Sequence, residues 1–220
     1  MSSVLVTGAS RGIGLELCKY YLARGLRVHG VCRKASAELQ DSGVNIIANV
    51  DVTNAEGVAR LRDALKDEEI GILINNAGVF GNHTLGEIDY ADLDHQLQVN
   101  AVAPLRVTEA LINNLSSGSK IALITSRMGS IADNTSGGYY GYRMSKAALN
   151  AAGVSLARDL KPRGIAVAIL HPGFVQTQMV NFSGDISPAV AAERLAARIA
   201  ELNLDNSGSF WHSNGEILPW

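Results

Sequence analysis

The stretch Thr7-Gly8-Ala9-Ser10-Arg11-Gly12-Ile13-Gly14 follows the short apolar run Val4-Leu5-Val6 and leads directly into a helical pattern. Glycines let a backbone approach a pyrophosphate closely, and the first turn of a helix offers free N–H groups and a partial positive charge. The spacing is G-x-x-x-G-x-G, because Leu17 stands where G-x-G-x-x-G would have its third glycine. Alone, such a turn can be a tight loop and nothing more. Between a strand and a helix it predicts a dinucleotide site, and the candidate binding residues are Gly8, Ser10, Arg11, Gly12, Ile13 and Gly14.

Apolar runs and amphipathic runs alternate along the rest of the chain. We expect further strands over 26–32, 44–50, 70–74, 120–125 and 165–170, and a short last strand around 210–211. We expect helices over 14–23, 55–66, most of 89–115 with a bend or a new first turn at Pro104, 139–160 and 188–202. This alternation has no composition break. It predicts one α/β domain over residues 1–220, a Rossmann-type doubly wound parallel sheet of about seven strands with helices on both faces.

Composition excludes several classes of protein. The formal net charge is −2 with no long run of one sign, which argues against nucleic-acid and anionic-membrane partners. No apolar stretch reaches the roughly 18 residues that span a bilayer, and the first residues do not resemble a signal peptide. Cys18 and Cys32 are the only cysteines, so we expect free thiols and no zinc site. We therefore expect a cytoplasmic, globular protein without a metal centre.

The end of the second expected strand bears on the choice of dinucleotide. NAD-specific folds commonly carry an acid there, about 20 residues beyond the glycines, to bind the ribose hydroxyls. Here the strand ends in Val31-Cys32-Arg33-Lys34, without an acid. Arg33 could clamp a 2′-phosphate, with Arg11 closing on it from the other side, although both could be solvated arginines. The residues favour NADP(H) over NAD(H).

Two further strand ends carry candidate cofactor-binding residues. Asp51 and Val52 follow the third strand and could recognise the adenine edge, although Asp51 could instead cap a helix. Asn76, Ala77 and Gly78 follow the fourth strand, where their backbone could line the ribose. Ligands bind beyond the carboxyl ends of the strands in such sheets, at the point where the strand order reverses.

Tyr142 and Lys146 are the candidate chemical pair. They lie four residues apart in a helical run, so their side chains share one face. An ammonium close to a phenol favours the phenolate and is expected to lower the tyrosine pKa from about 10 toward neutrality. Such a hydroxyl is a usable general acid or base. An isolated Y-x-x-x-K is more often an ordinary surface pair, so the interpretation depends on the neighbouring motifs.

These motifs occur in one order along the chain and together resemble the short-chain dehydrogenase/reductase family over about residues 4–180. They are Thr7-Gly8-x-x-x-Gly12-x-Gly14, Asn75-Asn76-Ala77-Gly78, Asn100, Ser126, Tyr142-x-x-x-Lys146 and Pro172-Gly173-x-Val175-x-Thr177. Within the family, 136–143 and His171-Pro172-Gly173 are similar to the branch of the C-factor proteins and sniffer-type carbonyl reductases.

The resemblance implies a role for each residue of the catalytic set, Asn100, Ser126, Tyr142 and Lys146. Ser126 would bind the substrate carbonyl oxygen, and Tyr142 would protonate it as hydride arrives. Lys146 would hold the nicotinamide ribose, and Asn100 would hold a water that resupplies protons. Thr177 would bond the nicotinamide carboxamide. The segment after the sixth strand thereby adds to the cofactor-binding set Pro172, Gly173, Val175 and Thr177, together with Tyr142 and Lys146.

Two features depart from the family pattern. Ser126 and Tyr142 lie sixteen residues apart, which is longer than usual, so Ser130 is a competing choice for the serine. The surplus falls in 133–138, where a loop can bulge without moving its ends. The chain between Thr177 and Pro188 is short for a lid over the substrate, which suggests an open site with broad tolerance.

We therefore predict an NADPH-dependent reductase of ketones, aldehydes or quinones that acts on a small-molecule carbonyl substrate. The alternatives are a dinucleotide-binding signalling protein of the C-factor kind, and a reductase narrow for 3-oxoacyl thioesters or pteridines. Small residues crowd the helix after Lys146, and the family often pairs this helix across a two-fold axis, so we expect a homodimer or homotetramer.

Overall fold

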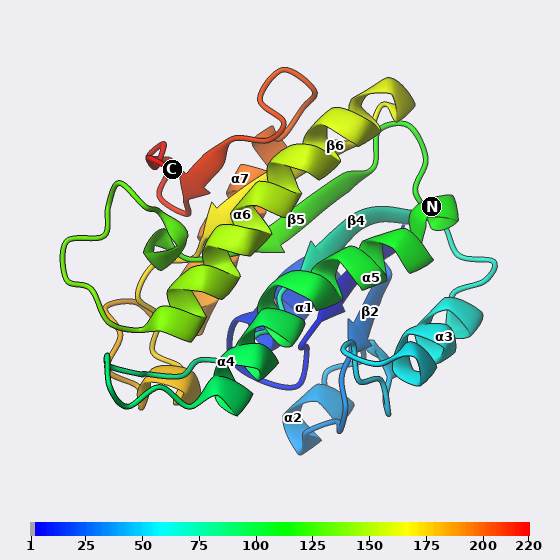
Figure 1. Cartoon of the computed structure of the whole chain (residues 1–220). Coiled ribbons are helices and arrows are strands. Elements are labelled where there is room, and N and C mark those ends of the chain that lie inside the picture. Colours follow the sequence, from blue (N-terminus) through cyan, green and yellow to red (C-terminus); the bar gives the residue numbers. More distant parts are fainter. Residues whose placement is uncertain (1–2) are drawn as a thin grey trace.

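The computed structural model describes residues 3–220, which contain one seven-stranded parallel sheet in the order β3-β2-β1-β4-β5-β6-β7. The strands are β1 (Ser3–Thr7), β2 (Val28–Val31), β3 (Asn45–Ile47), β4 (Ile70–Asn75), β5 (Lys120–Ile124), β6 (Ala166–His171) and β7 (Phe210–His212). The order reverses between β1 and β4, since β2 and β3 lie on one side of β1 and the later strands lie on the other. The predicted doubly wound sheet is confirmed (Figure 1).

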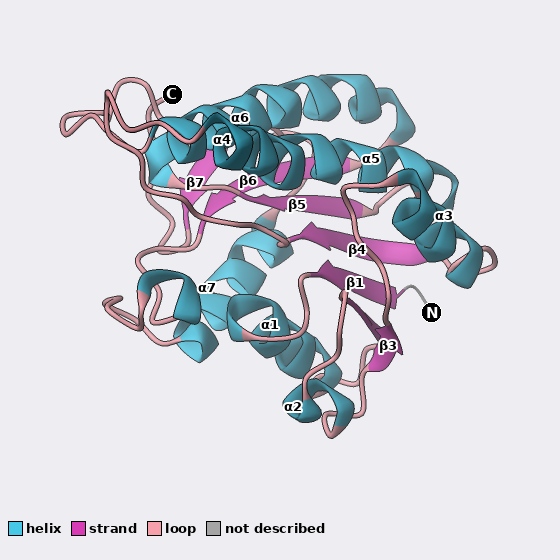
Figure 2. Cartoon of the chain, turned by 60° about the horizontal axis from the view of Figure 1, so that its bottom comes forward, coloured by secondary structure: helices cyan, strands magenta, loops and turns pink. Residues whose placement is uncertain are grey.

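Helices cover both faces of the sheet (Figure 2). On one face lie α1 (Gly12–Leu22), α2 (Ala37–Gln40) and α7 (Pro188–Glu201). On the other lie α3 (Ala55–Ala64), α4 (Tyr90–Leu97), α5 (Ala103–Ala110) and α6 (Tyr140–Leu160). Within residues 3–220 no helix combines the length and the apolar character that crossing a membrane requires.

The side chains of the central strands alternate between two hydrophobic cores, and a smaller third cluster contains Ile169 of β6 and Phe210 of β7. In β5, Ala122 and Ile124 join the core under α1 and α7, whereas Ile121 and Leu123 join the core under α3, α5 and α6. This alternation follows from the period of two along a strand, and both halves are apolar because both faces are covered. The strands are therefore nearly continuous apolar runs in the sequence, because helices cover both faces of the sheet.

The helical region predicted over 89–115 is divided into three main pieces. Asp89 caps α4 by accepting hydrogen bonds from the N–H groups of Ala91 and Asp92, and α4 runs into a π-helical turn over Gln98–Val102. Pro104 lies in the first turn of α5, where its missing N–H costs nothing, so its predicted place at a new first turn is confirmed. The π-turn was not predicted, and it contains Asn100.

Other boundaries also differ from the predicted ones. The second and third strands are shorter than predicted, and a four-residue helix, α2, lies between them. Ser36 caps α2, with its hydroxyl accepting a hydrogen bond from the Leu39 N–H. The stretch after β5 contains a short 3-10 helix at Arg127–Gly129. Such short helices have too few residues to produce a recognisable apolar period.

Leu123 provides a test of the core beneath the central strands. It is fully buried in β5, and Leu123→Ala should lower the free energy of unfolding by about 2–5 kcal/mol, because a cavity remains where the side chain was. The matched control is Leu105→Ala on α5, whose side chain is 39% exposed and should cost less than about 1 kcal/mol. Urea unfolding followed by circular dichroism measures both. Equal losses would contradict the proposed packing.

Candidate active site

The glycine loop between β1 and α1 forms a tight cradle. Gly8 has a φ of +69°, and a Cβ atom there would lie 2.9 Å from the Ala77 Cα. A Cβ at Gly14 would lie 2.3 Å from the Gly8 carbonyl oxygen, so a side chain fits at neither position. Arg11 occupies the N-cap position of α1, but its side chain does not hydrogen-bond the N–H groups of the first turn. These N–H groups can therefore bind an anion. The loop therefore fits a phosphate of a dinucleotide.

Side chains from β1 and β4 fix the shape of this cradle. The Asn76 amide donates to the carbonyl oxygens of Thr7 at 3.0 Å and Gly8 at 3.4 Å. In return the Thr7 hydroxyl accepts hydrogen bonds from the N–H groups of Asn76 at 3.0 Å and Ala77 at 3.1 Å. Asn76 thus has a structural role at the strand ends, while the backbone of Ala77 and Gly78 stays beside the cradle. Gly78 also approaches the catalytic candidates, since a Cβ there would lie 3.7 Å from the Lys146 Nζ.

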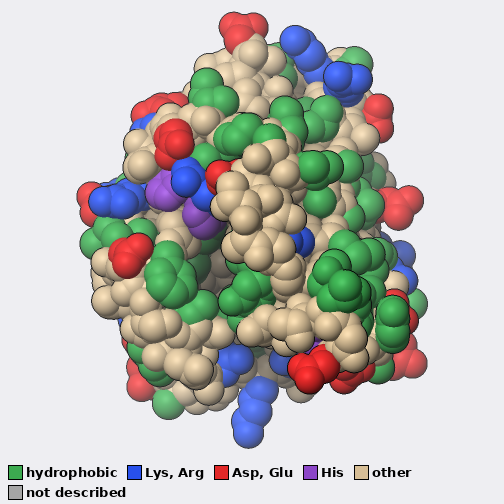
Figure 3. Space-filling view, turned by 60° about the vertical axis from the view of Figure 1, so that its left-hand side comes forward, with side chains coloured by type: hydrophobic (Ala, Val, Ile, Leu, Met, Phe, Trp, Pro, Cys, Tyr) green, Lys and Arg blue, Asp and Glu red, His purple; other side chains and the backbone are tan. Residues whose placement is uncertain are grey.

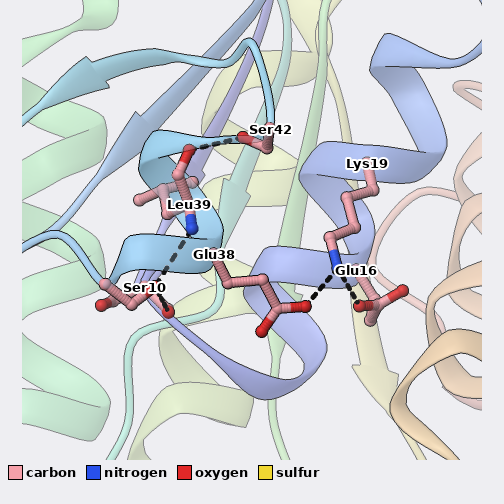
Figure 4. Close-up of polar contacts among 7 residues, drawn as sticks. Ser10, Glu16, Lys19, Glu38, Leu39 and Ser42 are labelled. Atoms are coloured by element: carbon pink, nitrogen blue, oxygen red, sulfur yellow. Dashed lines mark hydrogen bonds and ion pairs between the residues drawn. The ribbon is translucent and has the colours of Figure 1, made fainter.

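The segment after β2 is tied to the same loop. The Ser10 hydroxyl donates to the Lys34 carbonyl oxygen at 2.8 Å, and the Ser36 hydroxyl donates to the Ser10 carbonyl oxygen at 2.6 Å. Lys19 of α1 pairs with Glu16 and with Glu38 of α2, which holds the two helices together (Figure 4). These contacts place Arg33 at the edge of the cradle, with its side chain exposed.

The remaining candidates for the adenosine end lie nearby. Asp51 accepts hydrogen bonds from the N–H and hydroxyl of Thr53 at 2.9 and 2.6 Å, which hold the pKa of its carboxyl below the usual value. The helix cap of α3 is Asn54, not Asp51. Val52 lines a small void at the strand ends together with Ala77. The Arg11 guanidinium donates a hydrogen bond to the Gln178 side-chain oxygen at 2.6 Å.

Lys146 is buried beneath the end of β5. Its ammonium donates to the Ile124 carbonyl oxygen at 3.0 Å, and burial lowers its pKa to about 8. The nitrogen lies 5.7 Å from the centre of the Tyr142 ring. The pair thus shares one helix face, as predicted.

The prediction of a lowered Tyr142 pKa is wrong for this structure. Burial raises the pKa of the phenol above 10.0, and the hydrogen bond with Ser126 opposes that rise only in part. The physical reason is that the Lys146 ammonium is directed at the Ile124 carbonyl and is itself disfavoured by burial. Desolvation therefore decides the direction of the shift, which is upward.

Ser126 is the serine that reaches the tyrosine. It lies just after β5, is buried, and opposes the rise in the pKa of the Tyr142 phenol, while its hydroxyl accepts a hydrogen bond from the Met128 N–H at 3.1 Å. Ser130, the competing choice, accepts from the Asp133 N–H and stabilises the turn that follows. The loop can approach α6 because residue 129 is glycine. A Cβ at Gly129 would lie 2.7 Å from the carbonyl carbon of Lys146.

Asn100 is fully buried in the π-turn, and its amide group is already engaged. The oxygen accepts from the Val79 N–H at 2.8 Å. The nitrogen donates to the Val79 carbonyl oxygen at 2.9 Å and to the Ser145 hydroxyl at 3.0 Å. Its side chain therefore joins the segment after β4 to α6. Ser145, which no chemical motif identified, completes this junction by donating to the Tyr142 carbonyl oxygen.

The segment after β6 closes the other side of the site. Gly173 has a φ of +98°, Val175 forms a β-bridge with Ile186, and Thr177 lies so near the glycine loop that a Cβ at Gly12 would be 3.3 Å from its methyl group. Pro172 accepts a hydrogen bond from Ser213. Figure 3 views the molecule from the side of the strand carboxyl ends and shows hydrophobic side chains on both sides of a recess. Phe174, Met179 and Phe182 of this segment are exposed.

Many curated proteins are similar to this chain. The 1-hydroxy-2-glutathionyl-2-methyl-3-butene dehydrogenase of Rhodococcus sp. (strain AD45) is 38% identical over the whole of both chains. The C-signal protein of Myxococcus xanthus is 46% identical over 69% of this chain and 93% of its own length.

Many solved structures are similar to this chain. The carbonyl reductase Sniffer of D. melanogaster superposes with a TM-score of 0.90 and 31% identity, covering all of both chains. The NADPH-bound carbonyl reductase from chicken fatty liver has a TM-score of 0.89 and 28% identity, covering all of this chain and 99% of that one. These similarities confirm the predicted resemblance to C-factor proteins and sniffer-type carbonyl reductases.

The matched region agrees with the motifs. Residues 2–186 match the short chain dehydrogenase family, a range that includes the glycine loop and all four candidate catalytic residues. The chain belongs to the short-chain dehydrogenase/reductase family and is an oxidoreductase.

Proposed function

We propose that this protein is an NADPH-dependent carbonyl reductase that transfers hydride to a ketone, an aldehyde or a quinone, with Tyr142 as the general acid. The observation that carries the proposal is the meeting of Ser126, Tyr142 and Lys146 at the carboxyl end of β5. The Ser126 side chain opposes the rise in the pKa of the phenol, which places it beside Tyr142, and the Lys146 ammonium is 5.7 Å from the tyrosine ring. Gly78 joins this group to the glycine cradle.

NADP(H) fits the cradle and the residues around it. The phosphates would rest on the glycine loop, and Arg33 would meet the 2′-phosphate at the exposed edge. The solved relative bound to NADPH has the same fold. When bound, the reduced nicotinamide supplies the hydride. The residues proposed to hold the cofactor are Gly8, Ser10, Arg11, Gly12, Ile13, Gly14, Arg33, Asp51, Val52, Asn76, Ala77, Gly78, Tyr142, Lys146, Pro172, Gly173, Val175 and Thr177.

The chain's own residues would manage the charge on the carbonyl oxygen. Ser126 would donate a hydrogen bond to this oxygen, and Tyr142 would deliver a proton to it as negative charge develops. A raised Tyr142 pKa keeps the phenol protonated at neutral pH, which is the state that an acid needs. Lys146 would hold the ribose and, while protonated, stabilise negative charge near the phenol. Asn100 would hold α6 against the segment that follows β4, because it bonds Val79 in that segment and Ser145 in α6.

A signalling role is the second candidate, since the C-signal protein is 46% identical over the aligned region. Binding alone requires neither Ser126 nor Tyr142, and the presence of the whole catalytic set favours an enzyme. A narrower reductase for 3-oxoacyl thioesters is also supported by a relative, the 3-oxoacyl-[acyl-carrier-protein] reductase of Escherichia coli (strain K12), which is 30% identical over 89% of this chain. Pteridine reduction remains an alternative within the same chemistry.

We also propose that the enzyme is cytoplasmic. Cys18 and Cys32 are both buried and free, which suits a reducing cytoplasm.

We further propose a homodimer or homotetramer, because small residues such as Ala147 and Ala151 lie on the part of α6 that the two cores do not bury. Light scattering at micromolar concentration measures the mass, and the mass of a monomer would contradict both assemblies.

Tyr142→Phe tests the proposed acid. Loss of the phenol should reduce the rate of carbonyl reduction by about 10²–10⁴-fold, the contribution typical of a positioned acid. The measurement is NADPH oxidation against a panel of aldehydes, ketones and quinones, with cofactor affinity measured separately. Tyr140→Phe is the matched control, because Tyr140 has Met144 four residues on and lacks a lysine partner. Full activity in Tyr142→Phe would exclude Tyr142 as the acid.

The pH dependence follows from the same two groups. Reduction requires a protonated Tyr142 and a charged Lys146, and the Lys146 pKa is lowered to about 8 by burial. We therefore expect kcat/KM for reduction to be constant below neutrality and to fall as pH rises through about 8. Lys146→Arg should move this fall to higher pH, because arginine keeps its charge. A rate that increases through pH 8 would contradict the assignment.

Arg33→Asp tests the choice of cofactor. The substitution replaces a cation with an acid at the site proposed for the 2′-phosphate, so NADPH affinity should fall by about tenfold or more while NADH affinity changes little or improves. Fluorescence titration with each nucleotide measures the two affinities. Arg60→Asp makes the same charge change on the exposed side of α3 and serves as the control. An equal loss for both nucleotides would show that Arg33 does not read the 2′-phosphate.

A further inference from the structure

Three polar side chains of the α4 region bind alternate residues of the segment that follows β4. Asn100 bonds both the N–H and the carbonyl oxygen of Val79. Gln96 accepts from the Gly81 N–H at 3.1 Å, and the Asp92 carboxylate lies 3.2 Å from the His83 Nε2. Asp92, Gln96 and Asn100 are spaced four apart and therefore share one face of the helix. We call these three residues the polar ladder.

Gln96 is the central rung, and the surrounding chain makes room for it. Gln96 is fully buried, and its side-chain nitrogen donates to the Asp92 carboxylate at 2.7 Å. Its side-chain oxygen accepts from Gly81, so the one amide group links Asp92 to the segment after β4. A Cβ at Gly81 would lie 2.4 Å from the Gln96 nitrogen, and a Cβ at Gly141 would lie 2.9 Å from it. Glycines on the segment and on α6 thus both accommodate one buried glutamine. Gly141 directly precedes Tyr142.

Phe80 lies between Val79 and Gly81, the two residues that Asn100 and Gln96 bind. Its ring contacts the Tyr142 ring edge-to-face, with the ring centroids 4.9 Å apart. It also lies 5.8 Å from the Tyr139 ring. Tyr139 has the left-handed φ of +54° and donates its N–H to the His83 carbonyl oxygen at 2.9 Å, which ties the far end of the segment to the start of α6. The rungs therefore determine where Phe80 sits.

We propose that Gln96 is a positioning residue, which holds residues 79–83 so that Phe80 forms one wall of the substrate site against the Tyr142 ring. This inference rests on the proposed function, because it gives Phe80 a role in binding the carbonyl substrate. Phe80 itself would determine specificity by contacting the substrate group next to the carbonyl. Neither Gln96 nor Phe80 takes part in proton transfer.

Gln96→Met tests the proposal with a side chain of similar length. It removes both hydrogen bonds and leaves the Gly81 N–H without its acceptor, so residues 79–84 should open more often. We expect the amide hydrogen exchange of this segment to rise by about tenfold and the KM for the carbonyl to rise by a similar factor, while kcat changes by less than about threefold. Phe80→Ala should raise KM comparably, and adding it to Gln96→Met should raise KM little further, because both act through one wall.

Two further variants keep the test decisive. Gln98→Met makes the same substitution at an exposed position two residues along and should change neither quantity. Asp92→Ala removes the partly exposed outer rung, so it tests the ladder if Gln96→Met does not fold, with a smaller rise in exchange and in KM.

The outcomes separate this proposal from the proposed function. Unchanged exchange over 79–84 in Gln96→Met overturns the ladder. Increased exchange, or a lowered melting temperature, with an unchanged KM overturns the role of the ladder in substrate binding. If the wild-type protein reduces no carbonyl, the proposed function fails, and the exchange measurement still decides whether Gln96 holds the segment.

Discussion

The burial of the Lys146 ammonium is the constraint on which the rest of the site depends. A charge removed from water is costly unless it finds a partner, and here the partner is the Ile124 carbonyl at the end of β5. That bond fixes α6 against the sheet at the point where Ser126 leaves the strand. The Thr125 hydroxyl reinforces it at 2.7 Å from the Asn150 amide oxygen, one turn further along α6. Gly129 then allows the serine loop to lie on the lysine backbone.

The second constraint is the π-turn that contains Asn100. A regular helix satisfies its own backbone and leaves side chains to pack or face water, whereas the π-bulge is a feature often found at functional sites. Here the turn places a fully buried amide between the Val79 backbone and the Ser145 hydroxyl. Each polar atom of Asn100 is thereby satisfied, which is the condition under which a buried amide adds rigidity. Asn100 consequently fixes the position of the segment after β4 relative to the start of α6.

The sequence predicted the sheet and the site residues but not the contacts that hold them. The doubly wound parallel sheet follows from the alternation of apolar and amphipathic runs, and it is confirmed. The candidate site was expected beyond the strand ends, and the structure brings its residues together beyond the ends of β1, β4 and β5. The π-turn at Asn100 and the four-residue α2 were missed, because neither has a periodic pattern of its own. Gln96 was missed because one buried glutamine in an amphipathic helix resembles an exposed one. Only its spacing from Asn100 could have indicated the shared face.

The error over the Tyr142 pKa concerns the balance between two known effects. Proximity to an ammonium lowers a phenol pKa, and burial raises it. The sequence reveals the spacing that creates proximity, but it does not reveal how deeply the pair is buried or where the ammonium points. In the structure burial acts on both groups in opposite directions, raising the pKa of Tyr142 and lowering that of Lys146 to about 8. The phenol therefore keeps its proton to a higher pH than the ammonium does. The resting state is the protonated acid, which suits a group whose proposed task is to give a proton to a carbonyl oxygen.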